Sequence, residues 1–185
     1  LETILNSEVA ALAKCLQLVA EMEPGQVFFD KDFGPQSADD EEGKAASMYC
    51  NGVKPQSHPD PAQCEWLRPS EYLESDKTGK IAKFIKGDAS ANEVKQGALG
   101  DCWFIGALSV LATRDELLRG AAEKVPPELV QLIDAPTAKM MSSGVYPPIF
   151  HRFRNHGIYV HRFFKDSNWR YVLIDDRLPC YSSSM

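Results

Sequence analysis

Hydrophobic residues recur at helical spacing near the start of the chain. The apolar positions lie three or four residues apart: Leu5, Val9, Leu12, Leu16 and Val19. This periodicity places them on one face of a helix predicted over residues 3–22, which Pro24 and Gly25 end. We expect the helix to dock on its own domain, with a partner-binding helix as the alternative.

A long polar stretch follows over residues 34–63. It is rich in proline, glycine and serine, carries an acidic run at 39–42, and contains few large apolar side chains. Such composition predicts a long solvated loop. The acidic run could bind cations, although solvation is the simpler interpretation. Order is expected to return at Trp66, a core anchor, with Ser70 capping a short turn.

Two later segments have clear patterns. Residues 102–113 are apolar nearly all round, which predicts a helix buried in the middle of the domain. Residues 157–164 and 169–174 are rich in aromatic and β-branched side chains on either side of a polar turn at 166–168. They predict a β-hairpin.

Composition narrows the class of protein. The 185 residues include 20 Lys+Arg and 26 Asp+Glu, a net charge of −6, so a general nucleic-acid binder with a basic face is not expected. No apolar run reaches about 18 residues, so no membrane span is predicted. The start lacks a signal-peptide pattern, and the five cysteines form no CxxC pair. We therefore expect reduced thiols in the cytoplasm.

The strongest candidate for chemistry is the segment from Gln96 to Trp103. It delivers Cys102 to the first turn of a helix, where free N–H groups and the helix dipole stabilise a thiolate. Gly100 lets the backbone pass close to a substrate. The Gln96 amide and the Cys102 N–H could form an oxyanion hole, with Trp103 and Gly100 as walls of the substrate cleft. The alternative for Cys102 is an inert, buried core thiol.

The segment QGALGDCWFIGALSVLA, residues 96–112, resembles the active-site segment of the calpains, relatives of the papain-type cysteine proteases. Further segments carry the resemblance: 29–35, 65–69, 157–164 and 169–179. The family usually has a second proline where Gly34 stands.

The resemblance implies a papain-like α+β fold, restricted to the lobe that carries the nucleophile. That lobe has a central buried helix, packed helices and a C-terminal β-hairpin. Residues 1–25 would be the N-terminal helix, and residues 26–185 the first protease subdomain, incomplete at its C-terminus. Cys102 matches the family's nucleophile and Gln96 its oxyanion-hole glutamine.

The resemblance also implies an activating calcium ion in this lobe. Glu93 falls at the position of a carboxylate ligand, Gly87 matches a carbonyl donor, and Asp88 offers a further oxygen. Calcium accepts such oxygen ligands. The alternative for Glu93 is an ordinary surface carboxylate.

The general base is missing from the expected position. Papain-like enzymes place their histidine roughly 130–150 residues after the cysteine, whereas this chain ends 83 residues after Cys102. We therefore interpret His161 as a strand residue, and His151 and His156 as loop or strand-edge residues. A caspase-like order would nominate His58, but the caspase cysteine signature is absent and the surrounding loop is polar.

Two functions remain open. The first is the nucleophile half of a calcium-dependent cysteine endopeptidase that cleaves protein substrates in a limited way and is inactive without a second lobe carrying His and Asn. The second is a non-catalytic, calpain-like scaffold in a larger assembly, for example a cytoskeletal one. Either function is expected in the cytoplasm.

Overall fold

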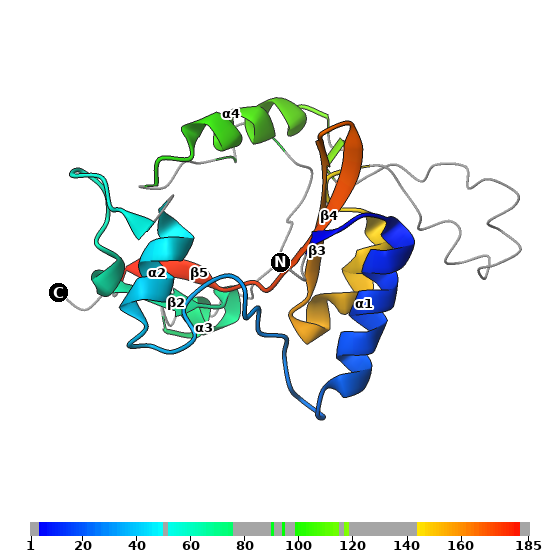
Figure 1. Ribbon diagram of the computed structural model, residues 1–185, viewed down its shortest axis with the longest axis horizontal. Coiled ribbons are helices and arrows are strands. Elements are labelled where there is room, and N and C mark those ends of the chain that lie inside the picture. Colours follow the sequence, from blue (N-terminus) through cyan, green and yellow to red (C-terminus); the bar gives the residue numbers. More distant parts are fainter. Residues whose placement is uncertain are drawn as a thin grey trace, which may run out of the picture.

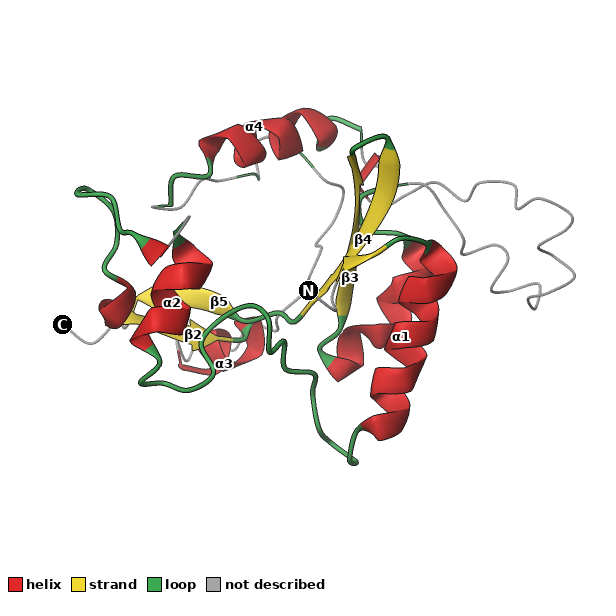
Figure 2. Cartoon of the chain, in the orientation of Figure 1, coloured by secondary structure: helices red, strands yellow, loops and turns green. Residues whose placement is uncertain are grey.

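The computed structural model describes residues 4–49, 52–75, 90, 94, 99–114, 117–118 and 144–181. The described helices and strands follow one another along the chain in this order: β1 (Ile4–Leu5), α1 (Glu8–Glu21), α2 (Glu41–Met48), η2 (Pro61–Gln63), β2 (Cys64–Leu67), α3 (Pro69–Ser75), α4 (Cys102–Leu111), η4 (Pro148–His156), β3 (Tyr159–Lys165), β4 (Asn168–Ile174) and β5 (Leu178–Tyr181). This mixture confirms the predicted α+β class (Figure 2). No helix among the described residues is long and apolar enough to cross a membrane.

The main core lies where α1 packs beside the sheet β1-β4-β3 (Figure 1). Its buried side chains come from α1, η4, the residue just before β3 and the two long strands: Ala11, Cys15, Ile149, Phe150, Phe153, Ile158, Val160, Tyr171 and Leu173. The predicted docking of the first helix on its own domain is therefore confirmed.

The predicted bounds and face of this helix need correction. The chain first forms β1, and Ser7 then caps α1 by accepting a hydrogen bond from the Ala10 N–H at 3.1 Å. The side chains of Val9 and Leu16 are 66% and 51% exposed, while Ala11 and Cys15 are fully buried. Leu5, Leu12 and Val19 of the predicted stripe do pack against the core, so the predicted face is confirmed in part. The small side chains of Ala11 and Cys15 allow the helix to approach the sheet closely.

The predicted β-hairpin is confirmed. Strand β3 pairs antiparallel with β4 from Tyr159 opposite Ile174 to Lys165 opposite Asn168. The two turn residues, Asp166 and Ser167, have φ values of 52° and 59°. Positive φ at both central positions is the backbone twist that a two-residue hairpin turn requires.

The polar stretch 34–63 is not the long loop that its composition predicts, because it contains α2 and η2. The acidic run supplies the start of α2. Asp40 accepts hydrogen bonds from the N–H groups of Gly43 and Gln36, at 2.9 and 2.8 Å. These bonds lower the pKa of Asp40. Capping by Asp40 therefore stabilises a helix in a segment with few apolar residues, and hydropathy does not detect such capping.

A second, two-stranded sheet joins β2 to β5, with Trp66 opposite Pro179. Helix α3 follows β2 directly. Ser70 does not cap it, because α3 begins at Pro69 and the Glu71 carboxylate accepts the Arg68 N–H at 2.7 Å. Proline in the first turn and a carboxylate reaching back to the residue before it are sufficient start signals.

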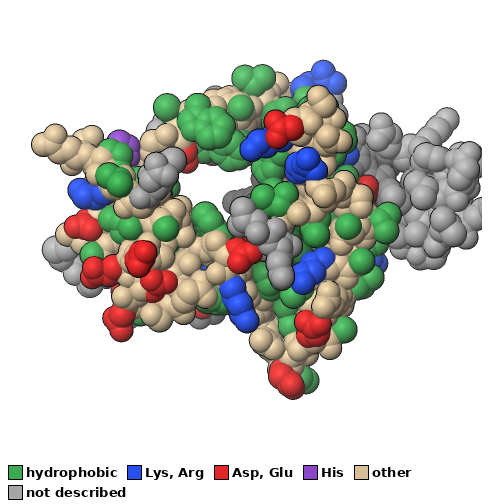
Figure 3. Space-filling model, viewed as in Figure 1, with side chains coloured by type: hydrophobic (Ala, Val, Ile, Leu, Met, Phe, Trp, Pro, Cys, Tyr) green, Lys and Arg blue, Asp and Glu red, His purple; other side chains and the backbone are tan. Residues whose placement is uncertain are grey.

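Helix α4 confirms the predicted helix but not its burial. None of its side chains is buried, and Trp103 and Val110 are 76% and 70% exposed. In the same orientation as Figure 1, Figure 3 shows an opening below α4, next to exposed hydrophobic side chains. An apolar helix is buried only where other elements cover it, and the described chain covers α4 on one side alone.

The three later histidines occupy structural positions. His161 lies in β3 as predicted, and burial lowers its pKa to about 4. His151 and His156 belong to η4 rather than to a loop or strand edge. His151 stacks on Tyr146 with ring centroids 4.3 Å apart.

Candidate active site

Cys102 is the first residue of α4 and is exposed. Asp101 caps the helix through its backbone: its carbonyl accepts the N–H groups of Phe104 at 2.9 Å and Ile105 at 3.0 Å. Its side chain makes no capping bond. The N–H groups at the start of a helix have no intrahelical acceptor, and the positive end of the dipole lies there. The thiol is thus accessible at the N-terminus of a helix.

An aromatic contact fixes the first turn of α4 to the hairpin. The ring of Phe104 lies 6.2 Å from that of Phe163 on β3, and the exposed Trp103 packs edge-on against Phe104 at 5.7 Å. Phe104, Leu108 and Phe163 line a cavity of about 270 Å³ behind the helix. The helix that carries Cys102 therefore packs on the hairpin through Phe104.

Gly100 meets a histidine from the polar segment. A Cβ added to Gly100 would lie 3.1 Å from Nε2 of His58. The Nδ1 atom of His58 is buried and has no hydrogen-bond partner within the described chain. The ring of Tyr49 packs edge-on against the imidazole, with centroids 6.0 Å apart. From the sequence, His58 is set aside because the caspase signature is absent and the surrounding loop is polar. Its contact with Gly100, 42 residues later, has no local signal in the sequence.

His58 is nevertheless not positioned as the general base. No hydrogen bond joins His58 to Cys102 among the described residues, and the imidazole Nε2 faces the backbone at Gly100. His58 and Gly100 together define how closely the segment 52–60 approaches the loop before the nucleophile. We call this the His58–Gly100 contact.

The His58–Gly100 contact predicts a specific epistasis. In Gly100→Ala, the new methyl group and His58 must move apart by a few tenths of an ångström. This movement is expected to lower the free energy of unfolding. In a His58→Ala background the same change is expected to cost less, with a coupling of about 0.5–1 kcal/mol. Urea unfolding of the four proteins measures the coupling. Strictly additive effects would show that the two residues do not touch.

Several predicted site residues lie outside the described residues. Gln96, Glu93, Gly87 and Asp88 belong to this group, so the oxyanion-hole and calcium assignments stay predictions. Within the described ranges, no group of three or more His, Cys, Asp or Glu side chains is arranged to hold a metal ion.

The other segments that carried the resemblance converge on one buried network around Arg177. Its guanidinium pairs with Asp175, with Nε 2.6 Å from Oδ2, and its Nη atoms donate to three backbone carbonyls: those of Asp30, Phe33 and Pro35. The Asp175 carboxylate also accepts the Asp30 N–H at 3.0 Å. Residues 145 positions apart are thereby tied together.

A second arginine extends the network. Arg68 pairs with Asp176 and donates to the Phe28 carbonyl at 2.5 Å. A Cβ on Gly157 would lie 2.8 Å from its Nη1. Gly157 also has a φ of 70°, so both space and backbone conformation require glycine there. Arg68 and Arg177 therefore hold together segments of the chain that are distant in sequence.

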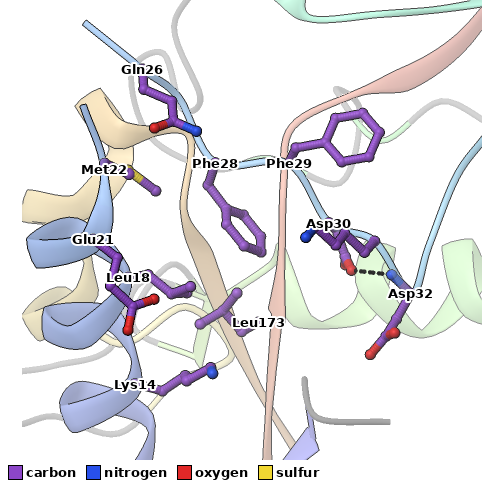
Figure 4. A pocket seen from close by; sticks show the side chains of 11 residues that line it. Lys14, Leu18, Glu21, Met22, Gln26, Phe28, Phe29, Asp30, Asp32 and Leu173 are labelled. Atoms are coloured by element: carbon purple, nitrogen blue, oxygen red, sulfur yellow. Dashed lines mark hydrogen bonds between the residues drawn. The ribbon is translucent and has the colours of Figure 1, made fainter. Parts of the chain in front are cut away.

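A cavity of about 410 Å³ lies between α1 and residues 26–32 (Figure 4). Leu18, Met22, Phe28 and Leu173 give it an apolar floor. At its edge the carboxylate of Asp30, 1% exposed, accepts the Asp32 N–H at 2.9 Å. Burial raises the pKa of Asp30, and the neighbouring Asp175 raises it further. The described residues that line it include none from α4, so this cavity does not belong to the Cys102 site.

Comparison with known proteins identifies one family. The family model described as calpain family cysteine protease matches residues 28–185. The chain is 30% identical over 178 residues to the calpain-2 catalytic subunit of Bos taurus, covering 95% of this chain and 19% of that protein. It is 33% identical over 116 residues to calpain-9 of Rattus norvegicus, covering 63% and 13%.

A plant protein with the same family name is also similar to this chain. The calpain-type cysteine protease DEK1 of Arabidopsis thaliana is 30% identical over 118 residues, which is 64% of this chain and 4% of that protein. The chain thus spans at most 19% of the length of these three curated relatives.

Proposed function

Because this chain belongs to the calpain family of cysteine proteases, we propose that it supplies the nucleophile for peptide-bond hydrolysis. The observation that carries the proposal is the exposed Cys102 thiol at the first residue of α4. The segment resembles that of the family in its cysteine, Cys102, and in the tryptophan that follows it, Trp103. The cysteine also stands at the start of a helix.

In the proposed reaction the Cys102 thiolate attacks the carbonyl carbon of the scissile bond. The Cys102 N–H and the Gln96 amide stabilise the oxyanion that forms. The leaving amine takes a proton from the general acid, and water then hydrolyses the thioester. Trp103 and Gly100 form walls of the substrate cleft.

The proposed function needs a base that this chain does not position. A histidine, oriented by an asparagine, would come from a second lobe that packs on the exposed side of α4. The exposed apolar side chains of Trp103 and Val110 support this docking, because such groups are usually covered in the working protein. Protein substrates would lie between the lobes.

Calcium dependence is part of the proposal. Glu93, Asp88 and the Gly87 carbonyl offer the hard oxygen donors that calcium prefers. Their chemistry fits the ion, which would align the nucleophile loop with the rest of the lobe. We also propose a reducing compartment, the cytoplasm, for this protein. The free thiols of the described cysteines support it: Cys15, Cys64, Cys102 and Cys180.

The alternative is a calpain-like scaffold that binds partners through the same exposed face of α4. A scaffold has no chemical need for Cys102. A cytoskeletal assembly would be one location for such a protein.

A casein cleavage assay tests the proposal that this chain supplies the nucleophile but not the general base. We expect no steady cleavage by the purified 185-residue chain, with or without calcium, because no described histidine is hydrogen-bonded to Cys102. Cys102→Ala serves as the matched control. Steady cleavage that disappears in Cys102→Ala would show that the chain carries its own base, and would overturn the need for a second lobe.

A further inference from the structure

The cavity behind α4 lies between that helix and strand β3 and has a volume of about 270 Å³. An apolar cavity of about 150 Å³ is enough to stay dry and to bind benzene. This one therefore has room for an aromatic ring with a substituent. Part of its wall consists of aliphatic side chains from both sides: Leu108, Leu118 and Val145.

Aromatic rings form the rest of the described wall. On the hairpin side, the ring of His161 lies 5.5 Å from that of Tyr146 and 6.4 Å from that of Phe163, and both pairs are stacked. On the helix side, the ring of Phe104 lies 6.2 Å from that of Phe163. Aromatic rings attract one another in offset-stacked and edge-to-face pairs at centroid distances of about 4.5–7 Å. The wall thus presents ring faces and edges to which a further ring can add.

The described wall carries no charge at neutral pH. None of the described residues that line the cavity is Lys, Arg, Asp or Glu. Burial lowers the pKa of His161 to about 4 and raises the pKa of Tyr146, so both rings are neutral. Arg162, the next residue on β3, points to the other face of the strand, where its guanidinium lies 4.1 Å from the ring of Trp169. A charged ligand would lose its hydration in this cavity without gaining a counter-charge, which is costly.

We infer that this cavity binds a small, uncharged aromatic molecule. Its ring packs on the rings of Phe104 and Phe163, and its edge contacts the side chains of Leu108 and Val145. The site is separate from Cys102, which is exposed and is not among the described residues that line the cavity. The inference therefore does not depend on the proposed peptidase role.

Toluene is the probe, titrated into the 185-residue chain with ¹³C-labelled leucine and valine methyl groups and followed by NMR. An aromatic ring shifts the signals of the methyl groups that it contacts. We expect saturable shifts of the methyl signals of Leu108, Leu118 and Val145. The methyl signals of Val9 and Leu16, which are exposed on α1, should not move. No saturable shift, or shifts on α1 without shifts at the cavity, would overturn the inference.

Two variants that fill the cavity test the same site. Leu108→Trp and Val145→Phe each place a larger side chain in it, and each is expected to weaken toluene at least about tenfold. Val9→Trp adds a large side chain at a position that is 66% exposed, and should leave the affinity within about twofold. Unchanged binding in both filled variants would overturn the inference.

A charged analogue tests the class of ligand. Benzylamine, which carries an ammonium group on the same ring, is expected to bind at least about tenfold more weakly than toluene. Equal binding of benzylamine would overturn the inference. The NMR spectrum shows whether each variant is folded, and loss of binding is assigned to the cavity only in a folded variant. If neither filled variant folds, the positions of the shifted methyl groups in the wild-type chain decide.

Discussion

Arg177→Ala is expected to lower the free energy of unfolding by about 3–5 kcal/mol, the cost of breaking a buried ion pair by removing one partner. The side chains of Arg177 and Asp175 are only 10% and 3% exposed. Without the guanidinium, the Asp175 carboxylate stays buried without its counter-charge. Three backbone carbonyls also lose a donor: those of Asp30, Phe33 and Pro35.

Urea unfolding followed by circular dichroism measures this loss. A domain of ordinary stability has about 5–15 kcal/mol in total, so the variant should be near the limit of folding. Arg177→Lys keeps the charge but not the planar set of donors. Its free energy of unfolding is expected to lie between those of the wild-type chain and Arg177→Ala. Lys165→Ala, at an exposed position at the end of β3, should change the stability by no more than about 0.5 kcal/mol. An equally small effect of Arg177→Ala would show that the network does not hold these segments together.

Cys102 is expected to react with iodoacetamide at least about a hundredfold faster than Cys15. Burial raises the pKa of the Cys15 thiol to about 12, so at pH 8 about one such thiol in ten thousand is ionised. Cys15 is also 0% exposed, whereas Cys102 is exposed. Burial likewise raises the pKa of Cys64 and of Cys180. The raised pKa values of these three thiols, together with the exposure of Cys102, lead us to expect that Cys102 reacts first.

Mass spectrometry of tryptic peptides over time gives the separate rates. Unfolded protein in urea is the control, because there the cysteines should react at similar rates. If Cys64 or Cys180 reacts before Cys102 in the folded chain, the exposed position of Cys102 at the start of α4 is wrong.

Local pattern was sufficient for the elements that contain their own signals. Strand periodicity and a polar turn defined the hairpin, and the apolar run defined α4, because both depend on neighbours in sequence. The start of α2 also had a local signal, the caps supplied by Asp40 and the first-turn acids. Composition concealed it, since the helix buries little beyond Lys44.

The exposure of α4 and the His58–Gly100 contact could not be derived from sequence in the same way. Burial of an apolar helix depends on which distant segments pack on it. Hydropathy shows only that the helix is apolar, not which segments these are. The roles of Arg68 and Arg177 were visible only as resemblance. Their partners lie up to 147 residues away and give no local pattern.

We propose that Cys102 is the nucleophile toward peptide carbonyls, and labelling with a peptidyl epoxide tests this role most directly. The chain is incubated with the probe, with and without calcium, and the modified residue is located by mass spectrometry. We expect a label on Cys102 that forms faster with calcium and is absent in Cys102→Ala. A label on another cysteine, or an unlabelled Cys102 in a chain whose iodoacetamide reaction is normal, would contradict it.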